Sequence, residues 1–130
     1  MEVIIGSEAI AAGELTRGAL RWNYTAILPG VYIPAGARRD VATRAKAAWL
    51  WTGREGIIAG RTAAALWGAH WVENTAPVEL IATSRRARSG VIVRNERIEG
   101  DEVCTDRFVR VTTPARTALD VARRLPRDDA

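Results

Sequence analysis

The sequence predicts an α+β fold whose first part is a winged helix-turn-helix, and three observations lead to this prediction. Two short helical segments precede the turn dipeptide Pro29-Gly30, which β-rich residues flank on both sides. Beyond residue 36, helical patterns give way to short segments rich in β-branched residues and then to a final helix. We therefore expect residues 1–36 to form a winged helix-turn-helix. Residues 37–130 are expected to form a small α+β region packed on it, with short antiparallel strands and a C-terminal helix.

Capping residues mark the predicted helices. The first helix is expected from Ser7 to about Ala12, and Gly13 ends it. Thr16 is the expected N-cap of a second helix over residues 17–23. Later helices are expected at residues 41–52, 61–67 and 114–125. Asp40 and Thr113 are the N-caps of the first and last of these three.

The predicted strands are short and separated by turn residues. They are expected at residues 24–28, 31–33, 78–82, 91–94 and 108–112. The arginine-rich stretch 84–90 is expected to be the loop that joins the strands at 78–82 and 91–94. In the helix at 41–52, one apolar face is expected from Val41, Ala45, Ala48, Trp49 and Thr52. Core packing is also expected for the tryptophans at positions 49, 51, 67 and 71.

Composition indicates a globular protein with a preference for polyanions. The chain has 130 residues, a formal net charge of +4 and an isoelectric point near 10.2. Lys46 is the one lysine among 19 basic residues, and arginine is the better ligand for phosphate and guanine. No apolar run is long enough to cross a membrane, and the N-terminus lacks the basic region of a signal peptide. With Cys104 as the single cysteine, no internal disulfide forms, and we expect a cytoplasmic protein without membrane contact.

Positive charge is concentrated outside the predicted helix-turn-helix. The first 36 residues hold three acidic and two basic side chains, whereas the stretches 38–46 and 84–97 are rich in arginine. If DNA binds, phosphate contacts are therefore expected from Arg38, Arg39, Arg85, Arg86 and Arg88. For the loop at 84–90 a second interpretation stays open, in which it is a charged hairpin tip that prevents edge-to-edge aggregation and binds nothing.

Three blocks in this order resemble AbiEi-type antitoxins, the transcriptional-regulator halves of type IV toxin–antitoxin systems. The blocks are residues 6–32 (with Gly6-Ser7-Glu8-Ala9 and Pro29-Gly30-Val31-Tyr32), 58–69 and 112–120. The order and the sequences of these blocks resemble those of actinobacterial, especially mycobacterial, proteins. In those relatives the region precedes an endonuclease-like domain related to very-short-patch-repair nucleases, which we expect to be absent here. Lys46 has no acidic residue two positions before it, so the sequence offers no nuclease signature either.

The resemblance implies that residues 17–23 form a recognition helix for double-stranded DNA. Thr16, Arg17, Arg21 and Asn23 are then expected to face the DNA, with residues 24–32, including Tyr32, as the wing. Arg17 and Arg21 are four residues apart and share a helix face. In the alternative interpretation both arginines are merely solvated and Trp22 packs inward, while Tyr32 belongs to the core of the hairpin.

Other residue pairs favour structural roles. Arg116 and Asp120 are expected to form an ion pair within the last helix. His70 is expected to be a core or capping residue, and with Cys104 it lacks the further ligands of a zinc site. No metal or cofactor is therefore expected. A nucleophilic pair of Cys104 and His70 is the weakest of the alternatives, because no third orienting residue is present.

The sequence thus favours a non-catalytic, DNA-binding transcriptional regulator of the antitoxin type. It would bind as a homodimer or at paired sites, with a cognate toxin as a further partner. The alternative hypothesis is a targeting or interaction module of a two-domain endonuclease-like protein, inactive without the missing nuclease domain. A third hypothesis, a small enzyme, is disfavoured because no acid–base cluster is visible.

Overall fold

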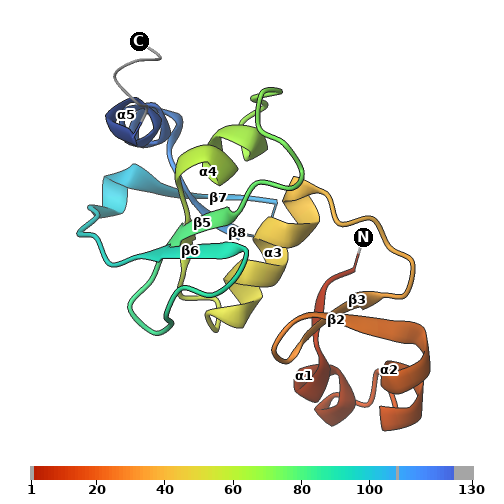
Figure 1. Ribbon diagram of the computed structural model, residues 1–130. Helices are drawn as coiled ribbons and strands as arrows, with labels where there is room; N and C mark the ends of the chain where they lie inside the picture. The colour runs from red at the N-terminus through yellow and green to blue at the C-terminus, as the bar shows by residue number, and fades with distance from the viewer. Residues whose placement is uncertain (1, 108, 125–130) are drawn as a thin grey trace.

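The computed structural model describes residues 2–107 and 109–124, which form an α+β fold (Figure 1). The helices are α1 (Gly6–Ala11), α2 (Arg17–Asn23), α3 (Val41–Trp51), α4 (Gly60–Leu66) and α5 (Pro114–Arg124), with a 3-10 turn η1 (Gly100–Glu102). The strands are β1 (Ile4–Ile5), β2 (Tyr24–Leu28), β3 (Val31–Pro34), β4 (Ile57–Ile58), β5 (Val78–Ile81), β6 (Val91–Arg94), β7 (Val103–Asp106) and β8 (Val109–Thr112). All five predicted helices and all five predicted strands are present. The predicted end of the last helix, near residue 125, lies outside the described residues.

Side-chain caps explain why the helix starts were predictable. The Thr16 hydroxyl oxygen accepts a hydrogen bond from the Ala19 backbone N–H at 3.0 Å, which starts α2. The Asp40 carboxylate accepts one from the Thr43 N–H at 2.8 Å, which starts α3. This bond holds the pKa of Asp40 below its ordinary value. Gly13 has a φ of +76°, the left-handed conformation expected of a residue that follows a helix.

The strands form two sheets, and one predicted pairing was wrong. The first sheet has the order β1-β3-β2 and is antiparallel; the second has the order β6-β5-β4-β8-β7. Strands β5 and β6 run parallel, as do β4 and β8, so the second sheet is mixed rather than antiparallel. The loop at 84–90 is therefore not a hairpin tip. After β5 the chain first runs back along this strand through the arginine run. It then reverses in a tight turn at residues 89–90, where Arg88 and Val91 exchange backbone hydrogen bonds, and enters β6 parallel to β5.

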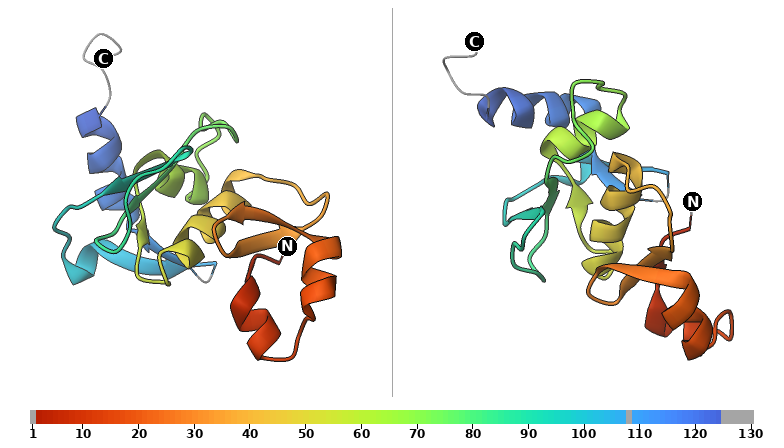
Figure 2. Two further views of the ribbon diagram at one scale, coloured as in Figure 1. Left: turned by 60° about the horizontal axis from the view of Figure 1, so that its bottom comes forward. Right: turned by 45° about the vertical axis from the view of Figure 1, so that its right-hand side comes forward.

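Helix α3 lies between the two sheets (Figures 1 and 2). One continuous core joins Val31 and Ile33 of the first sheet through α3 to Leu80 and Val111 of the second. The prediction of a single apolar face on α3 was too narrow, because the helix is covered from more than one side. Buried positions include Thr43, Ala47 and Leu50, outside the predicted face, whereas Val41 and Trp49 within it are half-buried. Alanines let the backbones approach closely there.

Two of the tryptophans predicted for the core lie at the surface. Trp51 is buried, but the residues Trp67 and Trp71 are exposed. The Trp67 indole N–H donates to the Thr112 carbonyl oxygen at 2.9 Å, which holds the ring at the edge of the core between α4 and α5. His70, expected in the core or at a cap, is exposed beside them. These residues follow the end of α4, where the chain turns away from the sheet into the loop that leads to β5.

Gly60 at the start of α4 offers a sharp test of the fold. Its φ is +58°, and a Cβ atom there would lie 2.5 Å from Glu79 Oε1. That carboxylate has little freedom to move, because it is buried and accepts hydrogen bonds from the Arg61 N–H and from Arg94. We expect Gly60→Ala to lower the free energy of unfolding by about 2 kcal/mol, measured by urea denaturation. Gly100→Ala is the control, since no atom lies within 4 Å of its Cβ position; an equal loss in both variants would contradict the argument.

Candidate nucleic-acid interface

The exposed face of α2 carries Arg17 and Arg21, the two arginines predicted for the recognition helix. Arg17, Gly18, Arg21 and Trp22 are all exposed, and at 100° per residue they occupy one continuous side of the helix. The opposite side holds α2 on its support through Leu20. A Cβ atom at Gly6 would lie 2.9 Å from Leu20 Cδ2, so this side chain presses directly on the α1 backbone. Helix α2 thus packs on α1 with one side and exposes Arg17 and Arg21 on the other.

The other residues predicted around α2 have varied surroundings. Asn23 is exposed at the end of the helix, and Thr16 is exposed with its hydroxyl used as the N-cap. Tyr32 is half-buried, and its ring covers Gly6 so closely that a Cβ atom there would lie 2.7 Å from Tyr32 Cε1. This placement agrees with the interpretation of Tyr32 as a core residue of the hairpin.

Trp22 does not pack inward. Its side chain is 77% exposed, and the Arg21 guanidinium carbon lies 5.6 Å from the centre of its ring. The cation lies over one face of the ring, and both side chains project into solvent. Sequence reasoning missed Trp22 as a site residue, although a helical projection places it beside Gly18 and away from Leu20.

An ion pair between distant segments reduces the negative charge near α2. The Glu8 carboxylate on α1 accepts hydrogen bonds from the Arg54 guanidinium at 2.8 and 2.9 Å. This contact lowers the pKa of Glu8, although both side chains are about half exposed. Because Arg54 lies after α3, a charge count confined to residues 1–36 overstates the acidity of this part of the molecule.

The arginines of the loop at 84–90 fall into two groups. Arg85 donates from Nε to the Trp51 carbonyl oxygen at 2.9 Å, and its guanidinium lies over the Trp51 ring. Arg85 therefore contributes to packing. Arg86 and Arg88 are exposed, and within the described part of the chain neither forms an ion pair. These two residues are the ones free to meet phosphate.

A groove connects this loop with the first sheet. Its walls include Ile27 and Leu28 of β2, Arg39 from the segment before α3, and residues 89–91 at the end of the arginine-rich loop. The structure thus brings Arg39 close to the loop at 84–90, as a shared phosphate-binding surface requires. Arg38 is exposed next to it but is not part of the groove wall, and neither are Arg17 and Arg21.

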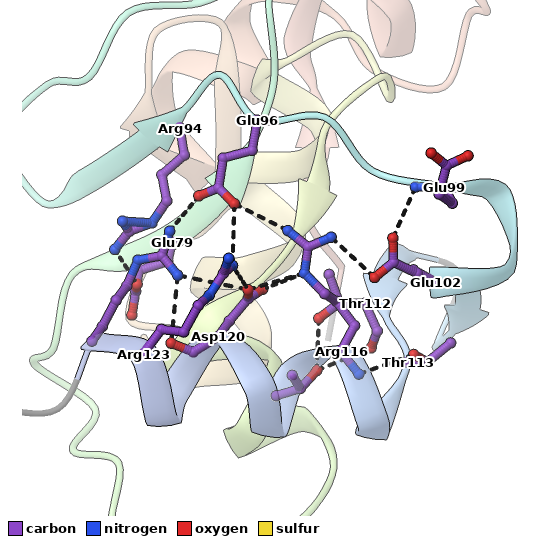
Figure 3. A network of polar contacts seen from close by, with 12 residues as sticks. Glu79, Arg94, Glu96, Glu99, Glu102, Thr112, Thr113, Arg116, Asp120 and Arg123 are labelled. Carbon is purple, nitrogen blue, oxygen red and sulfur yellow. Dashed lines mark hydrogen bonds and ion pairs between the residues drawn. The ribbon is translucent and has the colours of Figure 1, made fainter.

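A second concentration of charge lies at the opposite end of the molecule, on α5 (Figure 3). Arg116 is 7% exposed and donates to three carboxylates: Asp120 at 2.9 Å, Glu96 at 3.0 Å and Glu102 at 3.2 Å. The predicted pair of Arg116 and Asp120 is therefore confirmed, and it extends to the segments beside β6 and β7. We call this group the α5 network; its members are Glu79, Arg94, Glu96, Glu102, Arg116, Asp120, Arg123 and Arg124.

Comparison with known proteins places this region in a family. Residues 47–130 match the family described as AbiEi antitoxin C-terminal domain. The chain belongs to the AbiEi antitoxin family. The match begins within α3 and includes the second sheet and the α5 network, as well as the sequence blocks at 58–69 and 112–120. No curated protein and no solved structure matches the chain.

In this AbiEi antitoxin the α5 network is balanced in charge. Its four carboxylates face four guanidinium groups, so no excess charge is left to attract a metal ion or an anion. The pKa of Glu102 is lowered by the Glu99 backbone N–H and by Arg116, which favours the ionised, paired form. In residues 2–107 and 109–124, no group of His, Cys, Asp and Glu side chains is arranged to hold a metal ion. The arrangement is that of a structural clamp for α5.

In the described ranges, none of the helices of this AbiEi antitoxin has both the length and the apolar character needed to cross a bilayer.

Proposed function

We propose that this AbiEi antitoxin is a non-catalytic transcriptional regulator that binds operator DNA through a winged helix-turn-helix. In this proposal α1 and α2 form the helix-turn-helix, α2 is the recognition helix and the β2–β3 hairpin is the wing. The observation that carries the proposal is the exposed pair of Arg17 and Arg21 on the solvent face of α2. Arginine can donate two parallel hydrogen bonds to the O6 and N7 atoms of guanine.

The rest of the molecule supports a nucleic acid as the partner. The net charge of +4 attracts polyanions, and the groove beside β2 collects Arg39 and the loop that carries Arg86 and Arg88. A protein that reads bases through one element usually takes its phosphate contacts from others. In the α5 network the carboxylates are engaged by arginines, so they offer no general base, which favours binding over catalysis.

The first test is binding of the purified chain to the DNA upstream of its own gene, with random-sequence duplex as the control. Affinity is measured at about 50 mM and about 200 mM salt, because phosphate contacts weaken steeply over that range. Tight binding that prefers the upstream DNA at both salt concentrations supports the regulator. Weak binding without preference, lost at the higher salt, contradicts it and favours a targeting module whose function needs another domain. The length and symmetry of the protected region in a footprint of the upstream DNA then report whether the chain binds as a dimer or at paired sites.

The phosphate-binding role of the 84–90 loop gives a separate prediction. Arg86→Ala with Arg88→Ala should weaken binding to all duplexes alike and reduce the slope of log K against log salt by about 2, since each lost phosphate contact removes about 0.9. The preference for one sequence over another should not change. Arg61→Ala with Arg97→Ala removes the same charge from exposed positions outside the groove and serves as the control. An equal change of slope in both double variants would assign the effect to net charge alone.

A further inference from the structure

The exposed face of α2 has an apolar half beside its two arginines. Gly18 and Trp22 lie one turn apart on this face, next to the row formed by Arg17 and Arg21. Both are unusual choices for an exposed helical position. Gly18 lowers the helix propensity of α2, and Trp22 leaves a large apolar side chain in water.

Nothing in the described structure requires a glycine at position 18. Its φ is not positive, and a Cβ atom would meet only the Thr16 Oγ1 at 3.8 Å, an ordinary van der Waals contact. Alanine would fit and would favour the helix. A helical glycine that its own chain does not need is expected where another molecule must come close to the backbone.

Trp22 lies next to Gly18 and enlarges the exposed apolar surface of α2. Its side chain projects into solvent, and the Arg21 guanidinium lies over the ring. The cation leaves one face of the ring for other contacts. An apolar side chain next to arginine on an exposed helix is suited to the major groove of duplex DNA, which admits an α-helix. There the C5 methyl group of thymine is the apolar feature of the base edges.

We propose that Gly18 and Trp22 are specificity-determining residues that read a thymine methyl group next to a guanine bound by arginine. Gly18 lets the backbone of α2 reach the base edges, and Trp22 covers the methyl group. This inference rests on the proposed function, because it requires α2 to enter the major groove. It adds that thymine is the base selected by Gly18 and Trp22, the apolar half of the exposed α2 face.

The test uses duplexes that the wild-type chain selects from a random pool, prepared either with thymine or fully with uracil, which lacks the methyl group. Burial of one methyl group is worth about 0.8 kcal/mol, so the wild type should bind the thymine form about fourfold more tightly. Trp22→Ala should bind both forms equally. Trp71→Ala, which removes another exposed tryptophan from the loop between α4 and β5, should keep the wild-type ratio.

Gly18→Leu separates close approach from folding. A Cβ atom at position 18 makes only an ordinary contact with Thr16 Oγ1, so the thermal unfolding midpoint should not fall, whereas affinity for both DNA forms should drop at least about tenfold. Unchanged affinity in Gly18→Leu, or an unchanged thymine-to-uracil ratio in Trp22→Ala, overturns the inference while the proposed function stands. If the wild type selects no duplex from the pool, the proposed function itself fails, and the inference fails with it.

Discussion

Replacing Arg116 with alanine should lower the free energy of unfolding by about 3–5 kcal/mol, the largest effect we expect from one substitution. The guanidinium is the shared donor to Asp120, Glu96 and Glu102, and Asp120 is 2% exposed. Without Arg116, Glu102 loses its arginine partner, and Asp120 and Glu96 keep only the more exposed Arg123 and Arg124. Because small domains are stable by only about 5–15 kcal/mol, a large share of the total stability is lost. Urea denaturation followed by circular dichroism measures the change.

Three further variants show whether the loss comes from the network. Arg116→Lys keeps the charge but cannot donate to three carboxylates in fixed directions, so its loss should be intermediate. Arg116→Ala with Asp120→Ala should cost less than the sum of the two single changes, because each single change breaks the same direct pair and the sum counts that pair twice. Arg97→Ala breaks a pair whose side chains are 92% and 67% exposed, and should change stability by less than about 1 kcal/mol. Similar losses for Arg97→Ala and Arg116→Ala would contradict a special role for the α5 network.

The network also explains how α5 is attached to the molecule. The side chains that the helix buries are polar, namely Arg116, Thr117 and Asp120. Thr117 shares a hydrogen bond of 2.6 Å with the Thr112 hydroxyl, and Arg116 and Asp120 reach the segments that flank β6 and β7. Polar contacts of fixed direction therefore set the position of α5, in contrast to the apolar packing around α3.

Signals that act within a few residues were readable from the sequence. Thr16 and Asp40 cap their helices through a backbone N–H three residues later, so neither start depends on the rest of the fold. The pairing of β5 with β6 depends on where the chain turns, and Gly90, with a φ of +82°, places that turn later than the arginine run indicated. Strands β1 and β4 have two residues each, too few to show any alternation. Their strand character comes from neighbours that are distant in sequence.

The same distinction applies to the candidate site. The spacing of Arg17 and Arg21 predicts a shared face, and the structure leaves both exposed. The ion pair of Glu8 with Arg54 joins residues far apart in the chain, so no local charge count could include it. The residue type of Trp22 favours burial, whereas its exposure depends on which side of α2 rests on α1. The position of Trp22 on the helical projection, opposite Leu20, is the sequence signal that indicates its exposure.

Arg17→Ala with Arg21→Ala should lower affinity for the preferred DNA by about 2–6 kcal/mol, since each specific contact is worth about 1–3 kcal/mol. Binding to random-sequence duplex should fall much less, so the ratio of the two affinities measures the loss of reading. Both side chains are exposed, so stability should change by less than about 0.5 kcal/mol. An unchanged ratio would remove α2 from DNA recognition.

Arg17→Lys with Arg21→Lys is the matched control for charge. Lysine keeps the attraction to phosphate but lacks the planar fork that bonds guanine twice. This variant should therefore retain the salt dependence of the wild type and still lose much of the sequence preference. If it retains both, the two residues act as phosphate contacts only, and the bases must be read by other parts of the surface. If the lysine and alanine variants lose preference to the same extent while only the alanine variant loses salt dependence, guanine recognition belongs to the arginine fork itself.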